Sequence, residues 1–263
     1  MDEIKPIPLE ELKVISGKLG FDLETTIKDY YLTLLLFHLS KINGLYFKGG
    51  TALNKMLLNH ARLSEDLDFT VKGSVTTKEN AIRKLIPKIN GFTGIEHDKK
   101  VHRFVRLIAH YANNEIKGSI IIDLNGRSKL LLKPENLELK HFYSGYIPSF
   151  KVNALNIKEM IAEKVCATAD RYAPRDYFDL YNIIKLKLPV SISLVRKKFK
   201  ANNEKFEPGN IFKNTNRIFN AWEEDLLPLT STKLPFAEVI GVIRGFFNYK
   251  ASSRKKKKAS LRR

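Results

Sequence analysis

The chain has 263 residues, of which 43% are hydrophobic and 10% aromatic, so it can fold around at least one sizeable core and is not a disordered chain. Its single cysteine, Cys166, excludes an intrachain disulfide and argues against a cysteine-based zinc site. The 46 lysines and arginines outnumber the 28 acids and give a formal charge of +18, which favours a polyanionic partner, nucleic acid first and an anionic membrane second.

No segment is suitable for crossing a membrane. The longest apolar run, around Leu34–Phe37, is far shorter than the roughly 20 residues that a spanning helix needs. The N-terminus begins with acidic residues and has no apolar run typical of a signal peptide. Together with the lone cysteine, these features lead us to expect a cytoplasmic protein without a membrane partner.

The predicted elements begin with helices over residues 8–41, where apolar residues recur at three- and four-residue steps. A short strand, Leu45–Lys48, then runs into the Gly49-Gly50 turn. Further strands and helices alternate as far as residue 125. Residues 126–155 have a mixed pattern that favours neither a helix nor a strand. After the turn we predict helix Thr51–His60, strand Leu63–Val71, helix Lys78–Asn90, and strands His102–Tyr111 and Gly118–Asn125.

Helices return from residue 156 onward. They are predicted over Ile157–Arg171, Pro174–Lys187, Ser191–Phe199, Ile211–Leu226 and Pro235–Tyr249. This order divides the chain into an N-terminal helical segment (1–44), a mixed α/β region (45–150) and a helical domain (151–250). The last segment, 251–263, is expected to be a flexible basic tail, because it holds seven lysines and arginines and no acid.

Two carboxylates share one face of the strand Leu63–Val71. Side chains alternate along a strand, so Asp66 and Asp68 project to one side while Leu67 and Phe69 enter the core. Carboxylates about 7 Å apart along a strand repel one another unless a cation lies between or above them, and such hard oxygen ligands suit Mg²⁺ or Mn²⁺. The alternative is an ordinary solvated strand face. An EF-hand loop is excluded by the residues that follow Asp68.

Two further features lie near this pair. Gly49 and Gly50 stand between a strand and a helix, where backbone N–H groups and the helix dipole can bind phosphate and Thr51 can add a hydroxyl. Alternatively, glycine is simply what a tight turn needs. Asp123 ends the apolar run of residues 120–122, and it could join the carboxylates from a neighbouring strand or serve as an ordinary turn residue.

The helix Ile157–Arg171 places a lysine among its apolar residues. At about 100° per residue, Lys164 falls within the apolar stripe, so its ammonium either extends to the surface or faces a cleft where it would neutralise phosphate charge. In the next helix, Asp176 suits the first turn, where it complements the helix dipole. Asp179 lies further in and is the better functional candidate, as a partner of Lys164 or as a base.

Three sequence blocks together resemble the AbiEii family of nucleotidyltransferase-like toxins, which includes the MenT-type toxins. The blocks are residues 48–53 (Lys-Gly-Gly-Thr-Ala-Leu), residues 62–69 (Arg-Leu-Ser-Glu-Asp-Leu-Asp-Phe), and Glu163–Arg171 with Arg175–Leu180. The resemblance spans roughly residues 45–182. One departure is the glycine motif, which reads Gly-Gly-Thr where the family often has Gly-Ser, although a hydroxyl remains available.

The resemblance implies an α+β fold: a DNA polymerase β-like nucleotidyltransferase core with a small mixed sheet and flanking helices, followed by a helical C-terminal domain that completes the active-site cleft. It also implies a toxin of a toxin–antitoxin system, linked to abortive infection, with an antitoxin protein as partner. Some members of the family transfer nucleotides from an NTP to the 3′ end of tRNA. We therefore expect Mg²⁺- or Mn²⁺-dependent transfer of NMP from an NTP to an RNA end, tRNA first, which would block translation.

The resemblance also assigns roles to residues of this chain. The residues implied to be catalytic are Asp66, Asp68, Lys164 and Asp179. Those implied to bind the nucleotide are Lys48, Gly49, Gly50, Thr51, Arg62 and Ser64. The metal is predicted to be held by Asp66, Asp68 and Asp123. We expect Asp123 or Asp179 to accept the proton of the attacking hydroxyl.

Two alternative functions remain at this point. A protein-modifying or kinase-like transferase on the same fold would use NTP to modify a protein hydroxyl, and the pool that takes the label, RNA or protein, distinguishes it. A non-catalytic RNA-binding protein would bind RNA with a steep salt dependence and would show no Mg²⁺-dependent NTP binding. The sequence contains no zinc-finger or RNA-recognition signature that supports this second alternative.

Overall fold

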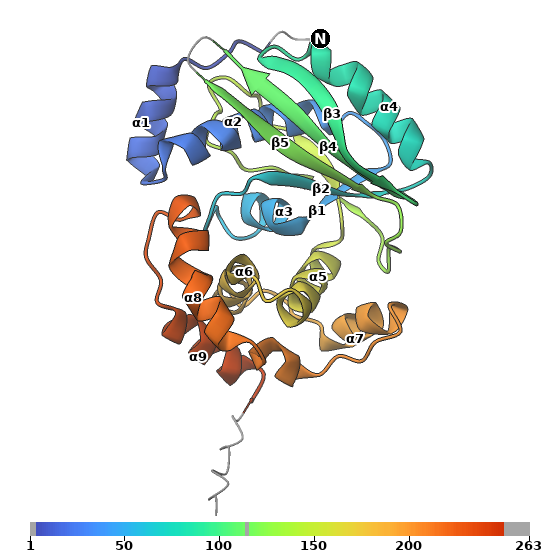
Figure 1. Cartoon of the computed structure of the whole chain (residues 1–263), viewed down its shortest axis with the longest axis vertical. Coiled ribbons are helices and arrows are strands. Elements are labelled where there is room, and N and C mark those ends of the chain that lie inside the picture. Colours follow the sequence, from blue (N-terminus) through green and yellow to red (C-terminus); the bar gives the residue numbers. More distant parts are fainter. Residues whose placement is uncertain (1–3, 114–115, 250–263) are drawn as a thin grey trace, which may run out of the picture.

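The computed structural model of the protein describes residues 4–113 and 116–249. Strands gather into one sheet in one half of the molecule, and a group of helices forms the other half (Figure 1). The basic tail predicted for residues 251–263 lies outside the described residues. Within the described part, no helix combines the length and the apolar character that a membrane span requires.

The sheet is mixed and has seven strands within the described residues, in the order β3-β4-β5-β2-β1-β7-β6. β1 pairs antiparallel with β2, whereas β2 is parallel to β5 and β1 is parallel to β7. The central strands therefore bring together segments that are far apart in the sequence. The bounds are β1 (Leu45–Lys48), β2 (Asp66–Val71), β3 (Phe92–Val101), β4 (Phe104–Ala112), β5 (Lys117–Asn125), β6 (Glu135–Glu138) and β7 (Lys151–Ala154).

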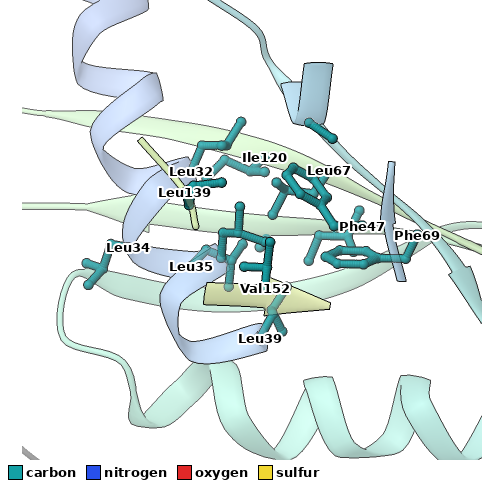
Figure 2. Packing of buried hydrophobic residues seen from close by; sticks show 14 of the residues in the cluster. Leu32, Leu34, Leu35, Leu39, Phe47, Leu67, Phe69, Ile120, Leu139 and Val152 are labelled. Carbon is teal, nitrogen blue, oxygen red and sulfur yellow. The ribbon is translucent and has the colours of Figure 1, made fainter. Parts of the chain in front are cut away.

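Helices α1 (Leu9–Leu19), α2 (Leu23–Leu39) and α4 (Val75–Leu85) share one hydrophobic core with the sheet. α2 begins at Asp22, whose carboxylate accepts a hydrogen bond from the Thr25 N–H at 3.0 Å and caps the helix. Most of α2 is buried, because its apolar residues extend nearly all round the helix. Figure 2 shows this core, with labelled side chains Leu32, Leu34, Leu35, Leu39, Phe47, Leu67, Phe69, Ile120, Leu139 and Val152.

The helical half has a hydrophobic core of its own, which runs from Ala162 to Ile243. It is built from α5 (Ile157–Asp170), α6 (Pro174–Lys185), α7 (Ile192–Ala201), α8 (Thr215–Leu226) and α9 (Phe236–Phe246). The short helix α3 (Gly49–Met56) lies between the sheet and this half, where it packs against α5 and α6 (Figure 1). α3 and its preceding turn thus lie where the two halves meet.

Within the residues that the structure describes, three strands were not predicted from the sequence: β3, β6 and β7. β3 is mostly exposed and carries charged residues such as Glu96 and Lys99, so its sequence lacks the apolar alternation of a half-buried strand. β7 is only four residues long, and its Ala154 pairs with Phe47 of β1. The sheet therefore takes in Lys151–Ala154, which lies beyond the expected end of the α/β region at residue 150.

Candidate active site

The two carboxylates of β2 lie on one face of the strand, as predicted. Asp66 is exposed and Asp68 is half-buried, while Leu67 and Phe69 between and beyond them are buried in the core. Burial and the charge of Asp66 raise the pKa of the Asp68 carboxyl to about 7, despite the opposing effect of the Lys48 ammonium. Two carboxylates that destabilise one another in this way suit a hard divalent cation, which would relieve the repulsion.

The two glycines that begin α3, Gly49 and Gly50, are required by their neighbours. Gly49 has a φ of +81°, and a Cβ there would lie 2.2 Å from the Asp68 Oδ2 atom. A Cβ on Gly50 would lie 2.5 Å from the Arg62 Nη2 atom. Glycine at these positions therefore allows Asp68 and Arg62 to approach the backbone of the turn at the start of α3.

Thr51 was expected to present its hydroxyl to phosphate. In the structure its side chain is buried, and Oγ1 donates a hydrogen bond to the Asp66 carbonyl at 2.6 Å and lies 3.3 Å from Asp66 Oδ1. The hydroxyl thus holds the start of β2, and Thr51 is not among the residues that line the cleft between the sheet half and the helices. Thr51 therefore contacts Asp66 of the carboxylate pair, through both the backbone carbonyl and the carboxylate of that residue.

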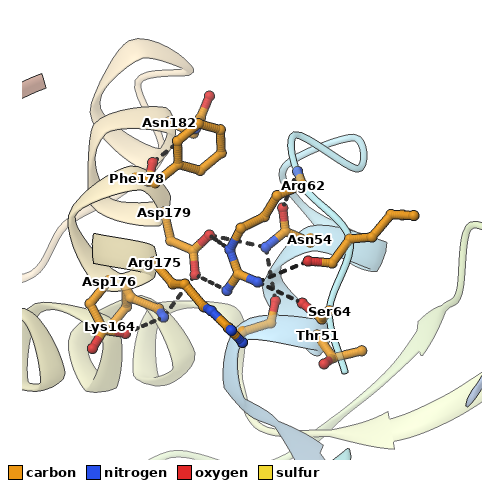
Figure 3. Close-up of polar contacts among 12 residues, drawn as sticks. Thr51, Asn54, Arg62, Ser64, Lys164, Arg175, Asp176, Phe178, Asp179 and Asn182 are labelled. Carbon is orange, nitrogen blue, oxygen red and sulfur yellow. Dashed lines mark hydrogen bonds and ion pairs between the residues drawn. The ribbon is translucent and has the colours of Figure 1, made fainter. Parts of the chain in front are cut away.

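A buried cluster of charges joins the two halves of the molecule beside α3 (Figure 3). Arg62 donates from Nε to Asp179 Oδ1 at 2.9 Å and from Nη2 to Asp179 Oδ2 at 2.8 Å. The Lys164 ammonium lies 2.8 Å from Asp179 Oδ2 and 2.7 Å from Asp176 Oδ1. The predicted pairing of Lys164 with Asp179 is therefore present, and Arg62 extends it into the sheet half.

The surroundings of this cluster favour the charged forms of Asp179 and Lys164. Burial alone would raise the pKa of Asp179, but Arg62 and Lys164 outweigh it and lower that pKa to about 2. Burial alone would lower the pKa of Lys164, but Asp176 and Asp179 outweigh it and raise that pKa. Because both oxygens of Asp179 are already engaged and its proton affinity is low, its surroundings fit the partner role better than the role of a base.

Arg62 and Ser64 were both expected to bind the nucleotide. Arg62 lines the cleft, but its guanidinium is largely buried and donates from Nη1 to the Leu63 carbonyl at 3.0 Å and to Ser64 Oγ at 2.9 Å. Ser64 is buried and does not line the cleft. The observed contacts make both residues part of the support beneath the glycine turn.

Asp123 was expected to complete a three-carboxylate metal site. It lies on β5 directly opposite Asp68 in the parallel β2–β5 pair. However, Arg106 donates to both of its oxygens, at 2.7 and 2.8 Å. Across residues 4–113 and 116–249, no three His, Cys, Asp or Glu side chains form a group that could hold a metal, so the structure does not assemble the set of Asp66, Asp68 and Asp123.

These features surround a cleft of about 680 Å³ between the sheet half and the helices. The predicted site residues that line it are Lys48, Gly49, Gly50, Arg62, Asp66, Asp68 and Lys164. Thr51, Ser64, Asp123 and Asp179 do not line it, but each pairs with a residue that does. The structure thus brings the three sequence blocks together around one space, although the third block, which begins at Glu163, lies far from the first two in the chain.

Lys198 also lines the cleft, and the sequence did not mark it as a site residue. The Lys48 ammonium lies 3.1 Å from Glu163 Oε2 on α5, and the Lys198 ammonium on α7 lies 2.9 Å from Glu163 Oε1. Lys198 also lies 2.5 Å from Glu159, one helical turn before Glu163. The sequence offered one signal for this cluster of charges, namely the four-residue spacing of Glu159 and Glu163, because residues four apart share a helix face.

Comparison with known proteins gives one family match and several structural matches. The family model described as "Nucleotidyl transferase AbiEii toxin, Type IV TA system" matches residues 34–238. The fold is similar to that of MenT4, a nucleotidyltransferase toxin from Mycobacterium tuberculosis H37Rv, with a TM-score of 0.71 and 21% identity over 92% of this chain and 89% of that chain. No match was found among curated protein sequences.

Two structures from Helicobacter pylori are also similar. JHP933 has a TM-score of 0.59 and 19% identity, over 85% of this chain and 90% of that chain. A protein described as a putative nucleotidyltransferase has a TM-score of 0.58 and 19% identity, over 85% of this chain and 92% of that chain. At these identities the structural likenesses concern the fold alone.

Proposed function

Because the chain belongs to the AbiEii family of nucleotidyl transferase toxins, we propose that it transfers NMP from an NTP to an RNA end, the 3′ end of tRNA first, with a divalent metal held by Asp66 and Asp68. The predictions of family, fold class and nucleotidyltransferase activity are confirmed by the family match and the shared fold. Membership of a toxin–antitoxin family also implies an antitoxin partner and an NTP substrate.

The observation that carries the proposal is the position of the carboxylate pair. Asp66 and Asp68 line a cleft of about 680 Å³ together with the glycine turn that begins α3. Hard carboxylate oxygens that line such a cleft fit Mg²⁺ or Mn²⁺. When bound, the metal would neutralise charge on the phosphates of the NTP and on the departing pyrophosphate.

The chain's own residues would hold the triphosphate on the glycine side of this pair. The turn at Gly49 and Gly50 offers backbone N–H groups at the N-terminus of α3. Arg171 and Arg175 line the same cleft, and their side chains are 65% and 39% exposed. Both guanidinium groups therefore remain accessible to phosphate oxygens, whereas the ammonium of Lys164 is buried between two carboxylates and would act by holding them.

The proton of the attacking hydroxyl needs an acceptor near the carboxylate pair. Both candidates accept hydrogen bonds from basic side chains, but Asp123 is the better placed, because it has Arg106 as its one basic partner among the described residues, stands opposite Asp68 on the neighbouring strand and is 17% exposed. Asp179 is fully buried and paired with two cations. We therefore assign the proton-accepting role to Asp123 and a supporting role to Asp179.

RNA is favoured over protein as the acceptor by the charge of the chain. The formal charge is +18, and +11 remains after the seven positive charges of the tail are subtracted. A surface of this sign attracts the phosphate backbone of RNA without reading its sequence. The same positive surface would not in general strengthen the binding of a protein acceptor.

The proposal is tested by incubating the protein with bulk tRNA, Mg²⁺ and each of the four α-labelled NTPs. We expect label in the RNA and its loss with a chelator. Asp66→Asn should reduce incorporation by about 100-fold or more, since a metal supplies several kcal/mol of charge stabilisation. The matched control is Glu138→Gln on β6, at the far edge of the sheet, which should keep wild-type incorporation.

The same reactions with γ-labelled NTP and with protein acceptors separate this activity from its rival. Label from γ-labelled NTP, or label in protein instead of RNA, would replace nucleotidyl transfer to RNA by a kinase-like or protein-modifying activity. Full incorporation by Asp66→Asn at an unchanged unfolding temperature would show that the assigned metal site is wrong.

A further inference from the structure

The basic residues around the cleft differ in how they are paired. Lys48, Lys164 and Lys198 each form ion pairs with carboxylates. Arg127 and Lys129 also line the cleft and are exposed, but neither forms an ion pair with a carboxylate of the described residues. Arg127 donates instead from Nε to the His102 carbonyl at 2.6 Å. These two cations are therefore available to a polyanion that enters the cleft.

Arg127 and Lys129 belong to the loop of residues 126–134 that follows β5, which we call the β5 loop. In the sheet, β2 with its carboxylates lies between β5 on one side and β1 with the glycine turn on the other. The β5 loop begins after Asn125, which pairs with Thr70 near the end of β2. Asp66 lies at the other end of β2, where the strand begins. The glycine turn and the β5 loop thus approach the carboxylate pair from opposite sides.

This arrangement matches the geometry of nucleotidyl transfer. The attacking and leaving oxygens lie roughly in line across the phosphorus atom, so the acceptor and the departing pyrophosphate occupy opposite sides of the reacting phosphate. If the pyrophosphate lies at the glycine turn, the acceptor must come from the side of the β5 loop. On the basis of the proposed function, we propose that the β5 loop is the acceptor-RNA subsite, where Arg127 and Lys129 bind backbone phosphates next to the 3′ end.

The β5 loop is held at both ends, which makes it a defined binding surface. At its start, the Asn125 side chain accepts a hydrogen bond from the Arg127 N–H at 2.9 Å. At its far end, the buried carboxylate of Glu159 accepts hydrogen bonds from the N–H groups of Leu131 at 3.0 Å and Leu132 at 2.8 Å. Because the backbone between these anchors is fixed, the two cations keep their place on the cleft wall.

The test is a kinetic comparison of the double variant Arg127→Ala/Lys129→Ala with the wild-type protein. We expect its KM for RNA to rise by about tenfold or more, while KM for NTP and kcat at saturating RNA change less than about twofold, since uniform binding to the acceptor is lost. The slope of log KM for RNA against log salt concentration should fall by about 1.4, which is about 0.7 for each lost contact to single-stranded RNA. Lys133→Ala is the matched control, because this exposed lysine belongs to the same loop but does not line the cleft.

In the kinetic comparison, two outcomes would overturn this assignment. A raised KM for NTP with an unchanged KM for RNA would assign the β5 loop to the triphosphate. If Lys133→Ala raises the KM for RNA as much as the double variant does, the effect comes from the overall positive charge and not from a subsite. If the wild-type protein transfers no label to RNA, the proposed function fails, and fluorescence anisotropy with a labelled single-stranded RNA then decides the subsite separately. Weaker RNA binding by the double variant alone would support the subsite, whereas equal binding by both proteins would exclude it.

Discussion

At the scale of single residues, Gly49 and Gly73 provide a natural comparison. Both adopt a left-handed backbone conformation, with φ values of +81° and +91°. A Cβ on Gly73 would meet no atom within 4 Å, whereas a Cβ on Gly49 would lie 2.2 Å from an oxygen of Asp68. Backbone strain is thus common to both positions, and the steric conflict with the carboxylate pair belongs to Gly49 alone.

We expect Gly73→Ala to lower the free energy of unfolding by about 1–2 kcal/mol, the cost of a side chain in this backbone region. Gly49→Ala should cost more, and it should also reduce nucleotidyl transfer by about tenfold or more because Asp68 must move. Denaturant unfolding and the incorporation assay measure the two effects. Equal stability losses together with equal activity would mean that Gly49 serves only the turn.

At the scale of elements, Asp179 joins α6 to the sheet half. Its oxygens accept hydrogen bonds from Arg62, which follows α3, and from the Asn54 side chain of α3 at 3.1 Å. Lys164 of α5 completes the junction. Since all these groups are buried, removal of one charge leaves its partners without compensation in a low-dielectric interior. The helices of the two halves are therefore held together by groups that lie directly behind the cleft.

The pKa of Asp179, lowered to about 2 from an ordinary value of 3.8, makes this junction sensitive to acid. A carboxylate with a lowered pKa in the folded state stabilises the protein above its ordinary pKa, and this contribution is lost as the pH falls from about 4 to 2. We expect it to be worth about 2–3 kcal/mol at neutral pH. Urea unfolding between pH 7 and 2 should show the decline.

The variant Asp179→Asn should remove that part of the pH dependence and destabilise the protein at pH 7 by about 3–5 kcal/mol, because Arg62 and Lys164 lose their common partner. Glu138→Gln, which changes an exposed glutamate, should follow the wild-type curve. If Asp179→Asn retains the full wild-type decline in stability between pH 4 and 2, the ion pairs of Asp179 are not its source.

At the scale of the whole molecule, positive charge is divided between the C-terminal segment 254–263 and the rest of the chain. Seven of the positive charges lie in Arg254–Arg263 without any acid, and the remainder of the chain still carries +11. The tail is not part of any of the three family-like sequence blocks. Its contribution to RNA binding should therefore be general attraction, in contrast to the local role proposed for the β5 loop.

Truncation after residue 250 tests this division. We expect RNA affinity to fall and the slope of log affinity against log salt to decrease by up to about 5, since as many as seven phosphate contacts at about 0.7 each are removed. The kcat at saturating RNA should remain unchanged. A chain with the same tail residues in scrambled order is the control and should bind like the wild type. An unchanged salt slope after truncation would exclude the tail from RNA binding.

Much of the site was predictable because its signals are local. The alternation along β2 placed Asp66 and Asp68 on one face, and the helical period placed Lys164 among apolar residues. The strands that were missed had no such signal. β3 is an exposed strand with charged residues, and β6 and β7 are four residues long, so their existence depends on the neighbours that pair with them.

The sequence by itself determined the kinds of groups present and their spacing within single elements, because side-chain direction in a strand or helix follows from the local backbone. Only the tertiary structure decided which groups meet. Thr51 turns to the backbone of Asp66, Asp123 is held by Arg106, and Arg62 bonds Asp179 across 117 residues. A buried donor or acceptor takes whatever partner the fold brings within reach, and that choice depends on packing between distant segments.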